Sequence, residues 1–384
     1  MAVSDHERCR RCIVPASLPS ADQDETGVCS FYRRFDELES RLPDDHWRRR
    51  EAALRDIVAG ARRLNREYDC LVPLSGGKDS AFALHLCANV YGMRCLCYTF
   101  DNGYLSEHAR RNIINAVRAT KSDHHRLRPD TGSLARQYGL FLRNCGTPCP
   151  VCMRGIQAGE DVLSRRFRPP LVVSGSGRRI SYLNTVPELF QGGERSFYRR
   201  VLAGEDCADD LPALHTTPFR RRFSKAQRMM YDRLGVGDRM AWAYTRYLDI
   251  YDYVDVDFGS IRATIERELG WTAPDGEFEH MDCRLHGVAS FAQSRRVPRL
   301  SPRTLYHSNL IRLGQLTREE ALRWDREYFA ADAEPLELEK VLGELEVTRR
   351  EFDVATTGHT DLQKYRSSGD DALRRLYRRM AAKD

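Results

Sequence analysis

Apolar and polar positions alternate along residues 69–180 in a way that predicts strands and helices in turn. Short apolar runs are each followed by a stretch in which apolar residues recur every three or four positions. The expected strands are 69–74, 93–100, 124–127 and 170–174. The expected helices are 79–90, 107–119, 133–142 and 153–166. This alternation is typical of a doubly wound parallel sheet, an α/β fold with helices on both faces.

The segments on either side of this domain have a more helical pattern. Residues 184–256 are polar with helical spacing, and 331–384 predict charged amphipathic helices for packing or for contacts between two copies of the chain. The expected division is a Cys-rich segment at 1–35, a connector helix at 36–68, the sheet domain at 69–180, a mostly helical continuation of the functional region at 181–330, and C-terminal helices at 331–384.

The first expected strand ends in a hexapeptide that suits a phosphate group: Ser75, Gly76, Gly77, Lys78, Asp79 and Ser80. Two glycines allow a tight turn, and the start of the following helix adds unpaired N–H donors and a partial positive charge. Lys78 adds a full charge, while Asp79 is expected either to hold the turn or to bind Mg²⁺. A Walker A loop is excluded, because Asp79 follows the lysine and Val72 occupies the first glycine position.

Two later strands also end in polar residues or glycine. Asp101 follows the second strand, and Ser174 and Gly175 follow the strand at 170–174. Because ligands of such sheets bind beyond the carboxyl ends of the strands, we expect Ser75, Asp101 and Ser174 to converge on one site.

Cysteines near the N-terminus have the spacing of metal ligands. Cys9, Cys12 and Cys29 predict a small zinc knuckle, in which thiolates hold a tetrahedral ion and fold a segment too short for its own core. The position of an expected fourth ligand holds Tyr32, and His6 is an alternative. A three-thiolate zinc site and a remnant with free buried thiols therefore both stay open.

A second group of cysteines lies on a Gly/Pro loop just ahead of a helix. This loop, at residues 145–152, includes Cys149 and Cys152. Cys283 stands alone in a later turn rich in His and Asp, and we expect it to be the distal third ligand of the same centre. Such a trio can bind zinc, an iron–sulfur cluster or nothing.

Composition limits the setting of the protein. Net charge is +6, with six Lys against fifty-five Arg spread along the chain, which permits RNA binding but does not demand it. No apolar run reaches the ~18 residues of a membrane span. The charged, Cys-containing N-terminus is unlike a signal peptide, and the twelve Cys argue for reduced thiols, so we expect a cytoplasmic protein without a membrane partner.

The hexapeptide at residues 75–80 resembles the loop of the PP-loop ATP pyrophosphatases, which release pyrophosphate and leave AMP on a substrate oxygen. The N-terminal knuckle, the segment 72–80 and the distal stretch 282–322 together resemble the N-acetyl sugar amidotransferases of that superfamily. The loop at 145–152 is instead similar to that of tRNA-thiolating PP-loop enzymes.

The resemblance implies ATP and Mg²⁺ as cofactors, with the hexapeptide on the phosphates and Asp101 and Gly175 near the adenosine. Lys78 and Asp79 are the implied catalytic residues. A [4Fe–4S] cluster on Cys149, Cys152 and Cys283 is implied by the thiolating branch, with one iron free to carry sulfide. Arg178 and Arg179 stand where the superfamily has an acidic residue in its later motif.

Three hypotheses follow. The first is an ATP-dependent sulfurtransferase that adenylates a carbonyl or amide oxygen of a nucleobase, an RNA or a small metabolite and replaces it with sulfur from a donor. The second is an ATP-dependent amidotransferase or ligase on a sugar acid or other carboxylate, using ammonia from a partner glutaminase. The third is a non-catalytic metal-binding or RNA-binding protein with a vestigial loop.

Overall fold

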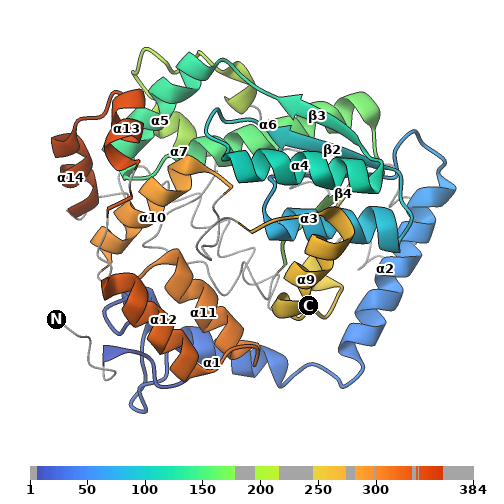
Figure 1. The fold of residues 1–384 in the computed structure, drawn as a ribbon, viewed down its shortest axis with the longest axis horizontal. Helices are drawn as coiled ribbons and strands as arrows, with labels where there is room; N and C mark the ends of the chain where they lie inside the picture. The colour runs from blue at the N-terminus through green and yellow to red at the C-terminus, as the bar shows by residue number, and fades with distance from the viewer. Residues whose placement is uncertain are drawn as a thin grey trace.

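The computed structural model describes residues 7–177, 195–215, 245–273, 282–297, 299–330, 334–335 and 337–357. Five parallel strands form one sheet in the order β3-β2-β1-β4-β5 (Figure 1). The strands are β1 (Cys70–Pro73), β2 (Cys95–Phe100), β3 (Asp123–Leu127), β4 (Leu171–Ser174) and β5 (Arg246–Asp249). The predicted doubly wound α/β fold is therefore confirmed.

Alternate residues of the central strands face opposite layers of helices. Val72 and Cys97 join a core with one layer, whereas Leu71 and Tyr98 pack on the opposite side of the sheet. The first layer contains α2 (His46–Arg63), α3 (Lys78–His85), α4 (Glu107–Thr120) and α9 (Phe258–Leu269). The second contains α6 (Cys149–Phe167), against which α5 (Thr131–Cys145) packs.

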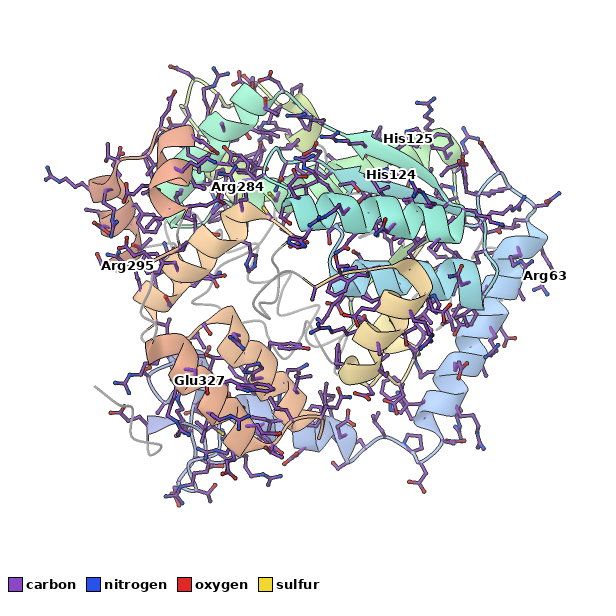
Figure 2. The ribbon with its side chains drawn as sticks, in the orientation of Figure 1. Arg63, His124, His125, Arg284, Arg295 and Glu327 are labelled. Carbon is purple, nitrogen blue, oxygen red and sulfur yellow. The ribbon has the colours of Figure 1, made fainter. Side chains whose placement is uncertain are left out.

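The edge strand β3 shows the same alternation in two neighbouring histidines, both labelled in Figure 2. The His124 Nε2 atom lies 2.8 Å from the Thr99 hydroxyl on β2. The next ring, that of His125, packs instead on Phe167 at the end of α6, with 5.2 Å between ring centroids. Burial lowers the pKa of His124, so this edge position is occupied by a neutral ring at neutral pH.

Seven further helices complete the described part of the chain. They are α1 (Ser30–Glu39), α7 (Arg195–Val201), α10 (Arg284–Arg296), α11 (Pro302–Arg312), α12 (Arg318–Ala330), α13 (Leu338–Glu344) and α14 (Arg349–Thr357). Short helical turns are Pro19–Ala21, Leu86–Val90, Pro212–His215 and Ile250–Asp252. Within the part of the chain that the structure describes, no helix is both long and apolar enough to cross a membrane.

Three expectations about these elements were wrong. The connector at 36–68 is two helices, because Pro43 lies between α1 and α2 and disfavours helix at the residue before it. The region 184–256 contains β5, a strand whose four residues are too few to show a period. The loop expected at 145–152 is shorter, because α5 runs to Cys145 and α6 begins at Cys149.

The N-terminal segment packs on α11 and α12, which follow it by about 270 residues or more in the sequence (Figure 1). Arg8 forms a buried ion pair with Asp325 of α12, and both side chains are only 3% exposed. The Arg318 Nε atom donates to the carbonyls of Cys9 and Cys12 at 3.2 and 3.0 Å. The Cys-rich segment thus shares a hydrophobic core with these helices.

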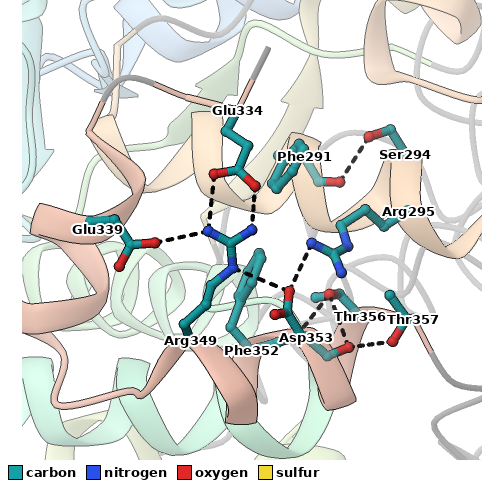
Figure 3. Close-up of polar contacts among 10 residues, drawn as sticks. All are labelled: Phe291, Ser294, Arg295, Glu334, Glu339, Arg349, Phe352, Asp353, Thr356 and Thr357. Carbon is teal, nitrogen blue, oxygen red and sulfur yellow. Dashed lines mark hydrogen bonds and ion pairs between the residues drawn. The ribbon is translucent and has the colours of Figure 1, made fainter. Parts of the chain in front are cut away.

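A network of ion pairs on the surface connects α14 to α13 and α10 (Figure 3). Arg349 of α14 pairs with Glu334, with Glu339 of α13 at 2.8 Å and with Asp353 at 3.2 Å. Asp353 also receives Arg295 of α10 at 2.8 Å. The network therefore joins three helices by charge, above the stacked rings of Phe291 and Phe352.

Gly76 makes the turn between β1 and α3 possible. Its φ is +87°, and a Cβ atom on it would lie 2.5 Å from the backbone oxygen of Ala109 in α4. Its own carbonyl accepts the Trp271 indole N–H at 2.9 Å and the Asn112 amide at 3.3 Å. The turn is therefore pressed against α4 and held there by two side-chain donors.

We expect Gly76→Ala to lower stability more than the matched change Gly204→Ala. Gly204 has nearly the same φ, +85°, but no atom lies within 4 Å of the Cβ that would be added. Backbone strain of about 1 kcal/mol is common to both variants. The clash with helix backbone should add about 2 kcal/mol to the loss in Gly76→Ala. Thermal unfolding measures the difference, and equal melting temperatures would contradict the close packing.

Candidate functional site

The exits of β2, β1 and β4 meet at the carboxyl edge of the sheet, because these strands are parallel neighbours. Chain order reverses at β1, which pairs with β2 on one side and with β4 on the other. Ligands of doubly wound sheets bind at such a switch point. Ser75, Asp101 and Ser174 thus lie at the ends of neighbouring strands, at the same edge of the sheet, and their sharing of one ligand stays a prediction.

Gly175 brings the exit of β4 against the beginning of α3. A Cβ atom on Gly175 would lie 2.3 Å from the backbone oxygen of Asp79, so only glycine fits without a shift. The distance places Gly175 beside the turn at residues 75–80, the expected phosphate site, which we call the phosphate-type turn. Its predicted role beside an adenosine stays a prediction.

Two serines hold the turn from inside. The Ser80 hydroxyl donates to the Gly77 carbonyl at 3.0 Å and accepts the Ser75 N–H at 3.2 Å. The Ser75 hydroxyl accepts the Gly77 N–H at 3.2 Å and lies 3.2 Å from the Ser80 hydroxyl. These bonds fix the shape that presents the start of α3, where helix N–H groups lack helical partners.

Lys78 and Asp79 begin α3 and touch different neighbours. Both oxygens of Asp79 accept hydrogen bonds, one from the Tyr251 hydroxyl at 2.9 Å and the other from the Lys78 ammonium at 3.2 Å. The Lys78 Nζ atom also lies 4.9 Å from the Tyr306 ring centroid of α11 and 5.8 Å from that of Phe258. The carboxylate is therefore occupied in holding the turn, and the ammonium lies against an edge-to-face pair of aromatic rings.

Asp101 is fully buried at the exit of β2. Burial raises its pKa, but the Gly103 N–H at 3.0 Å and the Arg126 guanidinium at 2.6 Å outweigh this, and the net pKa is lowered. Arg110 and Arg128 lie farther out, each 3.9 Å from the same carboxylate oxygen. Asp101 thus gathers three arginines at the edge of the site, and its predicted contact with adenosine is untested.

Sequence reasoning missed Asp249, which ends β5. Its Oδ1 atom accepts the hydroxyls of Ser174 at 3.2 Å and Ser176 at 2.6 Å, so it brings a carboxylate to the exit of β4. A carboxylate from the neighbouring strand thus lies beside the exit of β4. The only signal was the polar end of a four-residue strand. Arg178 and Arg179 lie outside the described residues.

Cys152 and Cys283 meet at one side chain. The Asn102 amide nitrogen donates to Cys283 Sγ at 3.1 Å and to Cys152 Sγ at 3.4 Å, which limits the separation of the two sulfurs to about 6.5 Å. The Tyr138 hydroxyl lies 3.1 Å from Cys152 Sγ. Cys149 begins the helix that carries Cys152. Residues far apart in sequence, from the β2 exit, α6 and the start of α10, are therefore brought together.

A short backbone pairing places Cys283. Leu105 and Cys283 form an isolated antiparallel bridge, and the Arg284 N–H donates to the Tyr104 carbonyl at 2.9 Å. The side chain of Arg284, labelled in Figure 2, is held by Glu337 at 2.8 Å and Glu344 at 3.2 Å. The chain after β2 thus fixes the start of α10.

Burial keeps this second cysteine group protonated in the absence of a ligand. Desolvation raises the pKa of Cys149 to about 11 and those of Cys152 and Cys283 to about 12. Among the described residues, the ligand atoms of one cysteine trio, at the N-terminus, all lie within 4.8 Å of one another. The sulfurs of Cys149, Cys152 and Cys283 are spread more widely than this. The second cysteine group thus lacks the compact spacing of a single tetrahedral zinc site, and its predicted cluster stays a prediction.

The N-terminal trio does have that compact spacing. The ligand atoms of Cys9, Cys12 and Cys29 all lie within 4.8 Å, and Cys12 Sγ is 3.6 Å from Cys29 Sγ. Tetrahedral zinc with bonds of about 2.3 Å places sulfurs about 3.8 Å apart. The Cys9 sulfur also accepts the N–H groups of Cys12 at 3.4 Å and Cys29 at 3.3 Å. These residues fit a structural zinc ion.

The alternatives for a fourth ligand differ in what the structure says. Tyr32 is buried and its hydroxyl accepts Arg11 at 3.2 Å. His6 lies outside the described residues. Arg312 of α11 is buried beside the three cysteines. Burial lowers the pKa of the Arg312 guanidinium, and the negative charges of the cysteine thiolates partly offset this decrease. A guanidinium here complements the net charge of −1 of three thiolates and Zn²⁺.

We expect Cys12→Ser to abolish zinc binding and to lower the free energy of unfolding by more than about 3 kcal/mol, because metal loss also loosens the core shared with α11 and α12. Cys207→Ser is the matched control, a buried thiol outside the trio. Metal analysis and thermal unfolding measure both effects. Wild-type protein without zinc, together with equal melting of the two variants, would mean that the segment is a remnant.

Comparisons with known proteins agree with part of this picture. Residues 300–380 match the family described as "LPS biosynthesis protein WbpG-like, C-terminal domain". The chain is 28% identical over 99 residues to "Uncharacterized protein MJ1599" of Methanocaldococcus jannaschii. That match covers 26% of this chain and 35% of the relative, so the chain spans about a third of the relative's length. Residues 300–380, about a fifth of the chain, are therefore similar to a domain of a lipopolysaccharide biosynthesis protein, which is consistent with relatives among the sugar amidotransferases.

Proposed function

We propose that this protein is an ATP-dependent, AMP-forming amidotransferase that acts on a sugar acid in the biosynthesis of a surface polysaccharide. One observation carries the proposal. Tyr306, from the region similar to the lipopolysaccharide family, lies 4.9 Å from the ammonium of Lys78 in the phosphate-type turn. The region that suggests a sugar and the turn that suggests ATP thus border the same space.

The chemistry fits the residues at the strand exits. A carboxylate oxygen of the substrate attacks the α-phosphorus of ATP, and pyrophosphate leaves. Ammonia then attacks the acyl carbon, AMP leaves with the original oxygen, and the nitrogen loses a proton to give the amide. Lys78 and the N–H groups at the start of α3 stabilise charge on the phosphates as the bond to pyrophosphate breaks. Mg²⁺, when bound, neutralises phosphate charge. We propose that a partner glutaminase supplies the ammonia.

Sulfur transfer is the second candidate, and the meeting of Cys152 and Cys283 at Asn102 favours it. The same adenylation would precede it, with a sulfide in place of ammonia as the nucleophile. Cys149, Cys152 and Cys283 would hold a [4Fe–4S] cluster, whose fourth iron has no protein thiolate and can bind sulfide. The substrate would then be a nucleobase, an RNA or a small metabolite.

We expect Lys78→Ala to slow the formation of AMP and pyrophosphate about a hundredfold, a loss of about 2.7 kcal/mol of transition-state stabilisation. Lys340→Ala on α13 is the control, because this lysine is 64% exposed and its ion pair with Glu337 is 3.8 Å long. Chromatography of labelled nucleotides measures the products. ADP and phosphate as products of the wild type would contradict an AMP-forming reaction.

A second experiment separates ammonia from sulfide. We expect ammonium chloride to support turnover of wild type and of Cys152→Ser alike, with no iron in anaerobically purified protein. Brown protein with about four irons per chain, and loss of both iron and turnover in Cys152→Ser, would favour sulfur transfer instead. Cys207→Ser again controls for loss of a buried thiol.

A further inference from the structure

We propose that Asp282 is the carboxylate that binds the divalent cation accompanying the nucleotide phosphates. This inference rests on the proposed ATP-dependent function and assigns a residue to it. Asp282 lies more than 200 residues after the phosphate-type turn in the sequence and directly precedes Cys283. Its position in the sequence therefore gives no sign that it binds a metal.

The Asp282 carboxylate lies over the residue that precedes α3. A Cβ atom on Gly77 would be 3.5 Å from the Asp282 Oδ2 atom and 3.3 Å from the Ser75 hydroxyl. Gly77 is the N-cap of α3, with extended backbone and no side chain of its own to cap the helix. The carboxylate therefore stands at the point where the turn and the helix start would receive a phosphate.

A carboxylate at an anion-binding turn repels a phosphate unless a cation lies between them. Mg²⁺ is bound in this way in nucleotide sites, through one or two carboxylates together with phosphate oxygens and several waters. A positive side chain could also neutralise the acid. Among the described residues, however, no ion pair or hydrogen bond joins the Asp282 carboxylate to a protein cation or donor.

Asp79, the acid in the turn itself, is less suited to the cation. Its two oxygens accept the Tyr251 hydroxyl at 2.9 Å and the Lys78 ammonium at 3.2 Å. Binding a cation there would break a bond that holds the turn or bring the cation against Lys78. Asp282, by contrast, accepts no hydrogen bond or ion pair through its carboxylate from any residue that the structure describes.

The backbone gives Asp282 a fixed place. Its carbonyl accepts the Ser106 N–H at 3.0 Å, and the next residue, Cys283, forms the bridge with Leu105. The negative charge of Asp282 contributes to the raised pKa values of Cys149 and Cys152, so the carboxylate also lies close to the thiols. A cation held here would sit between the nucleotide turn and the cysteine group.

Calorimetric titration of the full chain with α,β-methylene-ATP, a non-cleavable analogue, over a series of Mg²⁺ concentrations tests the proposal. For Asp282→Asn we expect the Mg²⁺ concentration at half-saturation to rise at least about tenfold. In EDTA the variant should bind the analogue as tightly as wild type or more tightly, because a repelling charge is gone. Glu107→Gln removes a carboxylate at the start of α4 that is 84% exposed, and it should behave as wild type.

Each other outcome has a definite meaning. An unchanged Mg²⁺ requirement in Asp282→Asn overturns the inference, and so does an equal loss of affinity with and without Mg²⁺, which indicates a structural role. If Asp282→Asn does not fold, Asp282→Glu keeps the charge and moves it by one methylene, and an unchanged Mg²⁺ requirement overturns the inference there too. A wild-type protein that does not bind the analogue contradicts the proposed ATP-dependent function itself.

Discussion

The close approach of three backbone segments at the carboxyl end of β1 is the constraint on which the site depends. Gly76 lies against α4 and Gly175 against the start of α3, at distances that a Cβ atom would not permit. The carbonyl of Gly76 is held by Trp271 and Asn112. Sheet, helix start and strand exit are therefore locked together before any ligand binds, which is the preorganisation that phosphate chemistry needs.

The segment after β2 extends this rigid centre toward the cysteines. The Asn102 amide donates hydrogen bonds to the sulfurs of Cys152 and Cys283. Leu105, three residues after Asn102, forms a backbone bridge with Cys283. Because Asn102 and Leu105 follow directly after the central strand β2, the sheet fixes the position of the thiols that they contact. The turn at 75–80 and the cysteine group are thus two parts of one edge of the sheet, and residues 282–283 lie between them.

The local sequence pattern was enough to predict most of the elements at the carboxyl edge of the sheet. The other residues reach this edge through contacts with segments distant in sequence. The strands from β1 to β4 and the turn at 75–80 follow from apolar periods and glycines that lie within a few residues of one another. Asp249 and Asp282 could not be placed from sequence, because each reaches the site through a strand or bridge partner far away along the chain. The break at Pro43 was visible in the sequence, but the apolar period on both sides of it favoured one helix.

The N-terminal Cys-rich segment and the turn at 75–80 are connected through one helix. On α11, Leu305 and Ile311 pack into the core of the knuckle, whereas Tyr306 lies over Lys78. A helix of eleven residues is too rigid for these faces to move independently, so the position of the ring over Lys78 depends on how firmly the knuckle is folded. The core around the three cysteines and the ring beside Lys78 are thus held by the same helix, so the N-terminal site and the turn at 75–80 share one structural support.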